Sequence, residues 1–553
     1  MKITFPKPPI KDTFLLNVAS CFLIIISHFI NYTFYIQYKI IFPDLILVIS
    51  GLGCVALALA ILLEINSLAL RLAIFTLLLT VIAGDAIFEY GVAETEDRLI
   101  AISLACLTIL AILFFLREHA DKILIAGCLA FFTSTVALGL GTTNALPAPQ
   151  QSTDAEPIDP RPTVVHLILD EHIGLAGISD DLPGGREIRN SLQEFYLKYG
   201  FRINSGAYSQ FFRTAPSLTT ALNFETTGAF DPHLKKNNYG YSINTNKILK
   251  FYYKFGYNIN IYQSNYINFC NIGNVITENC LTYSPDIFSS SEVVSLSISD
   301  RISLLSKMYF SSIALVKLAV LAEPHIHDWM FAQGIALPRL PIWHGRVGPI
   351  AVMPTLRQLT ADVARSRGGE IFFAHLLMPH YPYVYKANCE IRAPSSTWQI
   401  RLSTDREANA ASRRARYTAY FEQVRCVMKK LETLFAEMKK NGTFAASKII
   451  VHGDHGSRLG LVDPSASTLT SMSPDDYYDS YSTLFAFKAP GVEAEIDQRM
   501  LPLPHLLATT VFGERSNLAS TSAPKVFVPD KGTGILSVDL PKFRKVPPST
   551  GNH

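Results

Sequence analysis

The chain has 553 residues and a formal net charge of +3, with 49% hydrophobic and 17% charged residues. A charge this close to neutral argues against a nucleic-acid partner, which requires a concentrated basic surface. The composition is too apolar for a wholly soluble enzyme and too charged for a bare membrane bundle. Most long apolar runs precede residue 143, so we expect a membrane part and then a globular part of roughly 400 residues, large enough for one α/β core with insertions.

The N-terminal part contains five apolar runs, each close to the ~20 residues that cross a hydrocarbon core. Their flanks are basic at the N-terminus and after the second and fourth runs, and acidic after the third. The positive-inside rule therefore places the N-terminus in the cytoplasm and everything after residue 143 on the outer face. The five expected transmembrane helices lie at residues 13–36, 40–63, 68–88, 99–117 and 121–142.

Residues 302–322 are also apolar but are interrupted by Lys307 and Lys317. A sixth crossing here would separate the polar clusters on either side of it. We therefore expect an amphipathic helix, packed on the globular domain or lying on the bilayer surface.

The chain is accordingly expected to divide into four parts. The second of them is rich in proline and polar side chains, which predicts a linker. The parts are a five-helix transmembrane domain at 1–143, a linker at 144–162, a globular domain at 163–540 and a disordered tail at 541–553.

Four of the eight cysteines lie in the globular part, at Cys270, Cys280, Cys389 and Cys426. An oxidising compartment would allow two disulfides among them. Of the three arrangements open to four cysteines, we prefer Cys270 with Cys280 and Cys389 with Cys426. Four free thiols are the alternative.

The globular part opens with an apolar run, TVVHLIL, that ends at Asp170 and Glu171. Such a run is typical of a central parallel strand, and ligands collect at the carboxyl ends of parallel strands. Two adjacent buried carboxylates are costly unless a cation accompanies them. A metal ion meets that requirement; an arginine partner or simple exposure would also do so.

A second apolar run, residues 449–452, ends in Gly-Asp454-His455-Gly. A carboxylate beside an imidazole suits a divalent metal, although a structural Asp-His pair is the plainer alternative. Arg458 follows shortly after and could bind a phosphate oxygen or form a surface salt bridge.

Two further segments carry candidate catalytic side chains. In RTAPSLTT, Thr214 would lie near a helix N-terminus, which favours anions and a developing alkoxide, although Thr and Ser commonly begin helices for stability alone. In IFFAHLLMPHYPY, His380 lies between two prolines just beyond a buried strand, where it could bind an anionic substrate or protonate a leaving group. His375 lies inside that strand, and we expect it to be a core residue or to support the substrate side of the site.

Taken together, these four segments resemble the alkaline-phosphatase/sulfatase superfamily. TAPSL resembles the sulfatase signature C/S-x-P-S-R with Thr214 in the nucleophile position, Asp170-Glu171 the first metal element, MPHYPY the substrate-side histidine loop and GDHG the second metal element. Threonine cannot become formylglycine, and Leu218 replaces the arginine of the signature. A threonine nucleophile behind five N-terminal spans resembles the bacterial phosphoethanolamine and lipoteichoic-acid/phosphoglycerol transferases.

This resemblance implies a mostly parallel central sheet with helices on both faces, behind the five-helix bundle. It implies one divalent ion, zinc or manganese with magnesium or calcium also compatible, bound by Asp454, His455 and a first-strand carboxylate. Glu171 is the preferred carboxylate, by analogy with the transferases, and Asp170 comes close behind it. Thr214 would attack the phosphorus with the help of His380.

The implied reaction is transfer of a phosphoethanolamine or phosphoglycerol head group from a membrane phospholipid to an envelope glycan or lipid. The implied location is the bacterial inner (plasma) membrane, as a multi-pass protein whose catalytic domain faces the periplasm or the exterior. A phosphate or sulfate ester hydrolase on the same fold is the first alternative. A non-catalytic envelope-assembly protein is the second.

Overall fold

The computed structural model describes most of the globular part and portions of the N-terminal part. The described residues are 10–35, 42–63, 69–70, 72–80, 95–116, 160–229, 233–236, 240–285, 295–313, 347–399, 409–513, 523–529 and 534–547, with single positions at 292, 316, 330 and 333. By its internal contacts the chain forms two compact units, residues 1–151 with 293–345 and residues 152–292 with 346–553.

The first unit contains three long apolar helices, α1 (Ile10–Tyr35), α2 (Phe42–Leu63) and α4 (Thr95–Phe115). They coincide with the first, second and fourth expected spans. Within the described part of the chain, one segment, Ile46–Leu63, is long and apolar enough to cross a membrane by length and composition. The fifth expected span, 121–142, lies outside the described residues, so the five-helix bundle stays a prediction.

The helix α9 (Ile298–Ser312) covers the described start of the amphipathic segment expected at 302–322, and it belongs to the first unit. Its Tyr309 packs edge-on against aromatic rings of α1. The guanidinium of Arg301 donates to both carboxylate oxygens of Asp44, at 2.7 and 3.1 Å, and both side chains are buried. A buried ion pair is costly to break by removing one partner, so it joins α9 firmly to the start of α2.

The second unit is built on one eight-stranded sheet of order β11-β2-β10-β9-β1-β8-β5-β7. Seven strands are parallel and only β10 runs against its neighbours. The expected mostly parallel α/β sheet is therefore confirmed. The strands are β1 (Val164–Leu169), β2 (Arg202–Tyr208), β5 (Asn258–Ser264), β7 (Asn279–Tyr283), β8 (Glu370–Leu376), β9 (Lys448–Gly453), β10 (Phe485–Lys488) and β11 (Ile496–Pro502).

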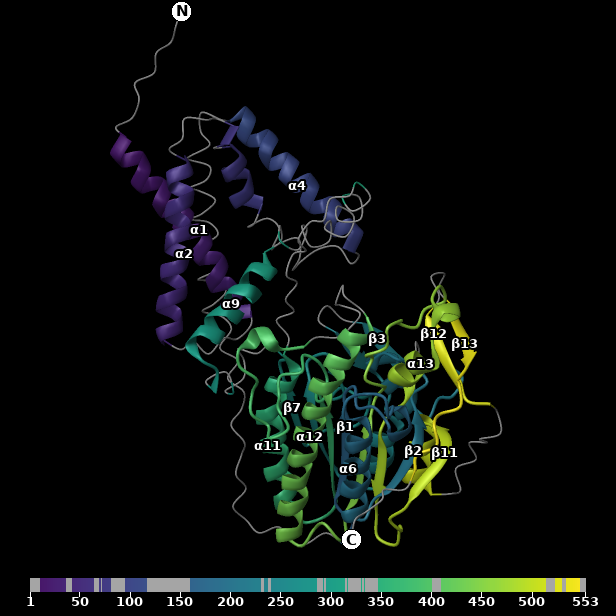
Figure 1. Ribbon diagram of the computed structural model, residues 1–553. Coiled ribbons are helices and arrows are strands. Elements are labelled where there is room, and N and C mark those ends of the chain that lie inside the picture. The colour runs from purple at the N-terminus through teal and green to yellow at the C-terminus, as the bar shows by residue number, and fades with distance from the viewer. Residues whose placement is uncertain are drawn as a thin grey trace, which may run out of the picture. The chain divides into compact units, whose positions relative to one another are not determined.

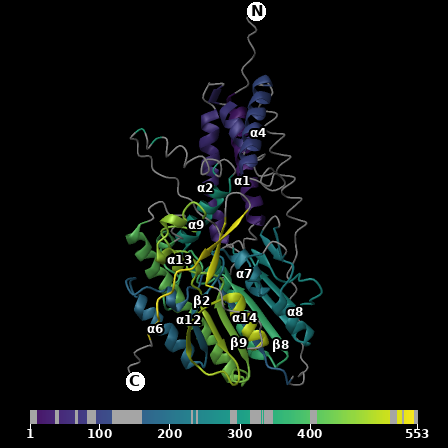
Figure 2. The same ribbon diagram turned by 90° about the vertical axis from the view of Figure 1, so that its right-hand side faces the viewer.

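Helices cover both faces of this sheet. Figure 1 shows α6 (Gly185–Lys198), α11 (Gly348–Arg365) and α12 (Ala410–Lys440) side by side on one face, and Figure 2 shows α7 (Thr214–Leu222), α8 (Lys247–Lys254) and α14 (Leu503–Phe512) on the other. Burial of apolar area at ~25 cal/mol per Å² is the main force that holds such layers together.

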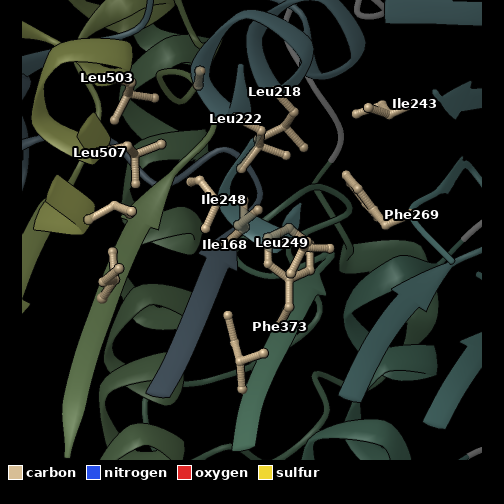
Figure 3. Close-up of a cluster of buried hydrophobic side chains, with 14 of the residues drawn as sticks. Ile168, Leu218, Leu222, Ile243, Ile248, Leu249, Phe269, Phe373, Leu503 and Leu507 are labelled. Carbon is tan, nitrogen blue, oxygen red and sulfur yellow. The ribbon is translucent and has the colours of Figure 1, made fainter. Parts of the chain in front are cut away.

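The core on the α7 side joins three helices to the central strands. Leu218 and Leu222 of α7 and Leu507 of α14 pack with Ile168 of β1 and Phe373 of β8 (Figure 3). Each of these side chains is buried completely or nearly so. This packing fixes the start of α7 close to the carboxyl ends of β1 and β9.

Residues 541–547 are the described start of the tail that is expected to be disordered, and they contact the globular domain. The ring of Phe543 lies edge-on against Tyr208 and Tyr478, and Val546 is buried. The proline and lysine content of this segment suggested disorder, but its two apolar side chains find partners on the domain. Residues 548–553 lie outside the described part.

Smaller elements lie around the main sheet. A three-stranded sheet and a two-stranded sheet flank it, and a short helix follows the loop after β9. These elements are β3 (Leu234–Lys236), β4 (Tyr241–Ile243), β6 (Ile267–Asn268), β12 (Lys525–Pro529), β13 (Ile535–Asp539) and α13 (Pro474–Tyr481).

Candidate active site

The candidate site lies where β1, β8 and β9 end side by side. β1 pairs in parallel with both other strands, and Leu169 lies opposite Leu376 and Gly453 in the register. Asp170 and Glu171 follow β1, and the Asp454-His455 pair follows β9. The parallel register therefore gathers segments that are almost 300 residues apart in sequence, as the strand-end clusters predicted.

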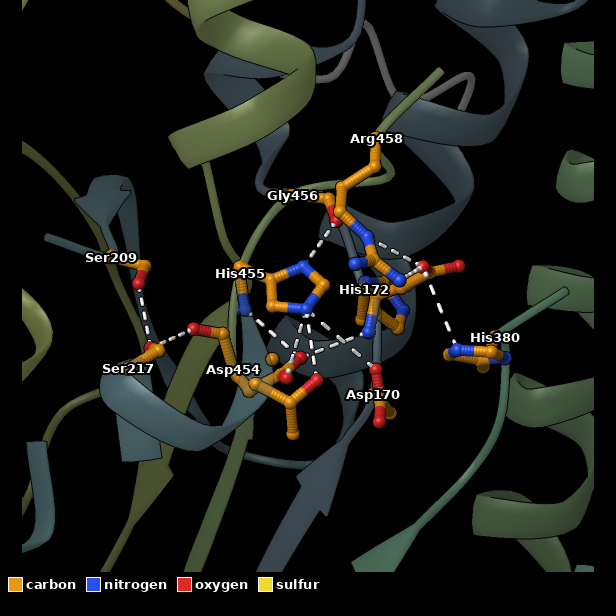
Figure 4. A network of polar contacts seen from close by, with 12 residues as sticks. Asp170, His172, Ser209, Ser217, His380, Asp454, His455, Gly456 and Arg458 are labelled. Atoms are coloured by element: carbon orange, nitrogen blue, oxygen red, sulfur yellow. Dashed lines mark hydrogen bonds and ion pairs between the residues drawn. The ribbon is translucent and has the colours of Figure 1, made fainter. Parts of the chain in front are cut away.

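Asp454 and His455 form the floor of the site. Asp454 Oδ1 accepts hydrogen bonds from the backbone N–H groups of Glu171 and His455, both at 2.9 Å. His455 Nδ1 lies 2.9 Å from the Gly456 carbonyl oxygen and must donate to it, which leaves the lone pair of a neutral ring on Nε2. That Nε2 faces Asp454 Oδ2 at 3.1 Å (Figure 4). Two lone pairs this close repel each other unless a proton or a metal cation lies nearby.

Thr214 is the first residue of α7, and its hydroxyl points toward His455. Its Oγ1 lies 3.1 Å from His455 Nε2. Only 5% of the residue is exposed. The TAPS segment is held in place by Ser217, whose hydroxyl donates to the Asp454 carbonyl and contacts the Ser209 hydroxyl at 2.6 Å. The predicted nucleophile and the predicted metal element thus meet.

Asp170 lies on the same floor with little to balance its charge. Its Oδ1 is 3.9 Å from His455 Nε2, and its Oδ2 is 3.4 Å from His375 Nε2. Burial, and then the charge of Asp454, raise the pKa of the Asp170 carboxyl well above its ordinary value. Within the described residues, Asp170 Oδ1 and Asp454 Oδ2 are buried oxygens without a hydrogen-bond partner. Both facts indicate a place for a cation.

Glu171, the preferred metal ligand from sequence, already has a cationic partner. Its Oε1 accepts from Arg458 Nε at 2.7 Å, and its Oε2 accepts from the Tyr381 backbone N–H at 3.3 Å. Burial raises the pKa of the Glu171 carboxyl, but Arg458, His380 and His455 together outweigh burial and the net pKa is lowered. His380 Nε2 lies 3.7 Å from Glu171 Oε1. The geometry therefore favours Asp170 over Glu171 as the carboxylate open to a metal.

Arg458 is oriented inward by the same ion pair. It adopts a positive φ of 53°, and Glu171 one of 64°, so both residues use a backbone conformation that is rare outside glycine. The side chain of Arg458 is 12% exposed. A guanidinium fixed beside the site in this way can bind a phosphate oxygen without losing much side-chain entropy.

The donor set fits a divalent metal ion. Two groups have ligand atoms within 4.8 Å of one another, Asp170 with Glu171 and His380, and Asp170 with His375 and Asp454. Imidazole and carboxylate together suit zinc and manganese. Burial lowers the pKa of His455 to about 4, although Asp454 opposes the shift, so the ring is neutral near pH 7, as a ligand must be.

The His380 loop is held from behind by α12, which the sequence analysis did not foresee. Gln423 is fully buried, and its Nε2 donates to the carbonyls of Pro379 and His380 at 3.0 and 2.9 Å. Its Oε1 accepts from the backbone N–H groups of Val384 and Tyr385 at 2.9 and 3.2 Å. In sequence, one glutamine on a long helix carries no signal that it holds a loop.

The structure contains both preferred disulfides. Cys270 bonds to Cys280, and Cys389 bonds to Cys426. The second joins the segment after His380 to α12, one turn from Gln423. The loop that carries His380 is therefore fixed both by hydrogen bonds and by a covalent link.

No protein-family model matches the chain, and neither does any curated protein sequence. Among solved structures, it is similar to the phosphonate monoester hydrolase of Silicibacter pomeroyi, at 13% identity over 64% of this chain and 73% of that chain, with a TM-score of 0.39. It is similar to the zinc complex of the C-terminal periplasmic domain of EcEptC from Escherichia coli, at 11% identity, 71% and 96% coverage and a TM-score of 0.38. A third is a protein in the alkaline phosphatase superfamily from Vibrio parahaemolyticus, at 10% identity, 64% and 67% coverage and a TM-score of 0.34.

Proposed function

We propose that this chain is a metal-dependent transferase that moves a phosphoethanolamine or phosphoglycerol head group from a phospholipid to an envelope glycan or lipid, through a covalent ester on Thr214. One observation carries the proposal: the Thr214 hydroxyl lies 3.1 Å from His455 Nε2, on a floor with two unpartnered carboxylate oxygens. A hydroxyl that served only to begin a helix would need neither neighbour.

One divalent ion, zinc or manganese, is proposed to be held by Asp170, Asp454 and His455, with Glu171 as the alternative first-strand ligand. When bound, the ion would lower the pKa of the Thr214 hydroxyl and offset the charge that develops on the phosphoryl oxygens. The orphaned oxygens of Asp170 and Asp454 support this assignment.

The proposed chemistry has two displacements. The Thr214 hydroxyl loses its proton to solvent and attacks the phosphorus, the bond from phosphorus to the diacylglycerol oxygen breaks, and diacylglycerol leaves with a proton. Protonated His380 is placed to give that proton: its Nδ1 donates to the Tyr381 carbonyl, so Nε2 is the nitrogen free to exchange. An acceptor hydroxyl then attacks the phosphothreonine and gives its proton back to His380, the bond from phosphorus to the Thr214 oxygen breaks, and Thr214 regains a proton from solvent. Arg458 would hold a phosphoryl oxygen in both steps.

The proposed location is the bacterial inner membrane, with the catalytic domain on the periplasmic or extracellular face. The helix segment Ile46–Leu63 supports a membrane anchor. The Cys270–Cys280 and Cys389–Cys426 disulfides support an oxidising compartment. An anchored site would work at the surface where the donor lipid is concentrated.

The proposal is tested by mass spectrometry of the peptide that contains Thr214 after incubation of the full-length protein with candidate donor phospholipids. We expect an added mass equal to one phosphorylated head group, which also identifies the donor. Thr214→Ala should lose both the adduct and transfer, whereas Thr219→Ala, a buried threonine of the same helix, should keep both. Activity at the wild-type level in Thr214→Ala would remove Thr214 from the mechanism. Release of free head group without an acceptor would indicate a hydrolase.

A further inference from the structure

Three fully buried histidines lie on the strands under the site, His166 on β1, His375 on β8 and His452 on β9. Two of them satisfy each other: the Nε2 atoms of His166 and His452 are 2.8 Å apart, and His452 Nδ1 donates to the Gly453 carbonyl. Among the described residues, His375 has no hydrogen-bond partner at either ring nitrogen. A buried polar group left in this state costs about 1–3 kcal/mol.

The unpartnered ring of His375 is directed at the two carboxylates of the floor. Its Nε2 lies 3.4 Å from Asp170 Oδ2, and ligand atoms of Asp170, His375 and Asp454 all lie within 4.8 Å of one another. The same two carboxylates carry the buried oxygens that have no hydrogen-bond partner, Asp170 Oδ1 and Asp454 Oδ2. The His375 ring and the carboxylates of Asp170 and Asp454 therefore lie close together, and each has an atom without a hydrogen-bond partner among the described residues.

We infer that His375 is itself a ligand of the metal ion, so that two imidazoles, His375 and His455, and two carboxylates, Asp170 and Asp454, hold it. This inference deepens the proposed function and rests on its metal centre. A cation at this point satisfies His375 Nε2, Asp170 and Asp454 together, which no described side chain does. The sequence position of His375, inside an apolar strand, had indicated a core residue or a contact on the substrate side.

A second imidazole changes which metal the site prefers. Magnesium and calcium favour oxygen ligands, and magnesium gives up its water reluctantly. Two nitrogens and two carboxylates instead favour zinc and other first-row transition metals. We therefore expect zinc to bind in the presence of a large excess of magnesium, and that preference to weaken when His375 is replaced.

The competing structural account is that His375 only orients Asp170 from behind and never touches the metal. Loss of metal affinity does not separate the two accounts, because removing a residue that orients a ligand also weakens binding by roughly 10–100-fold. The number of imidazoles around the metal does separate them. A direct ligand gives two, and an orienting residue gives one.

The test is X-ray absorption of the zinc-loaded full-length protein, in which multiple scattering counts imidazole ligands. We expect two imidazoles in the wild type, one in His375→Gln and two in the control His166→Gln, which removes an equally buried histidine of the neighbouring strand. Zinc affinity, measured by chelator competition, should also fall at least tenfold in His375→Gln, a loss that an orienting residue alone would produce as well.

Each outcome bears on a different claim. One imidazole in the wild type, or an unchanged count in His375→Gln, overturns the inference while leaving the threonine mechanism intact. A wild-type protein that binds no metal overturns the inference together with the metal dependence of the proposed function. If His375→Gln does not fold, the wild-type count alone still decides, because it is one or two before any substitution is made.

Discussion

Two loops meet at the site, and they are held in place by different means. The first, formed by the last residue of β9 and the loop after it (residues 453–458), is fixed by main-chain packing. A Cβ added at Gly453 would lie 2.5 Å from the His172 carbonyl oxygen, and one added at Gly456 would lie 2.3 Å from that of Asp479. The loop that carries His380 is fixed by side chains of α12. Its anchors are Gln423, the Cys389–Cys426 disulfide and an ion pair between Arg392 and Glu422.

This difference separates two tasks. The first loop presents two of the proposed metal ligands, Asp454 and His455. Their positions must hold to a few tenths of an ångström, and the close backbone contacts of the loop leave no alternative path for the chain. The second presents the proposed proton donor and borders the substrate, and one helix sets its position. Substitutions in the loop after β9 should therefore abolish metal binding, whereas substitutions in the anchors of the His380 loop should lower activity by graded amounts.

The strongest test of this comparison is Gly453→Ala. The new methyl group would meet the Thr483 hydroxyl at 2.4 Å and the backbone of His172, and overpacking of this kind costs about 1–3 kcal/mol or more. Because Asp454 follows directly, we expect metal binding and transfer to be lost together. Metal content by mass spectrometry and transfer activity are the measurements.

The control for this variant is Gly442→Ala. Gly442 has a positive φ of 74° and no atom within 4 Å of the added Cβ, so it tests backbone strain without a clash. We expect a stability loss of about 1–2 kcal/mol and normal metal content. Normal metal binding in Gly453→Ala would show that the first loop is more adaptable than its packing indicates.

The sequence predicted the strand-end residues of the proposed metal site far better than the residues that hold the His380 loop. The strands β1, β8 and β9 are apolar runs that end in polar clusters, so Asp170, Asp454 and His455 could be placed together from local pattern. Thr214 joined them through a recognisable motif. Gln423 could not be found in this way, because one buried glutamine in a 31-residue helix resembles any other until the loop that it contacts is known.

Contacts between residues far apart in sequence leave no local trace. Nothing in the sequence showed that Glu171 pairs with Arg458, 287 residues away. Nothing in the apolar pattern of β8 showed that His375 lies 3.4 Å from the Asp170 carboxylate. The polar composition of 541–547 gave no sign that Val546 is buried.

Lowering the pH should reduce the folding stability around the loop after β9 before it affects the loop that carries His380. Five buried histidines belong to β1, β8, β9 and the loops directly after β1 and β9. Burial lowers the pKa to about 4 for His172, His375, His452 and His455, and well below its ordinary value for His166. In the unfolded chain these rings titrate near 6.5, so between about pH 6.5 and 4 the unfolded state binds more protons and folding stability falls as pH falls.

Each such histidine contributes on the order of 1 kcal/mol per pH unit in that window. Asp170 and Asp479 act in the opposite direction, because burial raises the pKa of both carboxyls, but they are two groups against five. Hydrogen–deuterium exchange of the metal-free protein should show protection of β9 amides decreasing from pH 7 to pH 5, after correction for the intrinsic exchange rate. Protection that stays constant or increases would show that the histidine burial does not control this region.

The finest test of the comparison is Gln423→Met, which keeps the size of the side chain but removes its four hydrogen bonds to the His380 loop. A small displacement of a catalytic group can cost up to about 100-fold in rate, so we expect kcat for transfer to fall by about 10–100-fold while metal content and KM for the donor stay unchanged. The matched control is Gln193→Met, an equally buried glutamine on α6 that bonds the Pro547 carbonyl and should lose stability without losing turnover. Equal activities in the two variants would mean that the disulfide and the Arg392–Glu422 pair hold His380 without Gln423. A loss of metal in Gln423→Met would mean that the two loops act as one unit, and the division of tasks between them would be wrong.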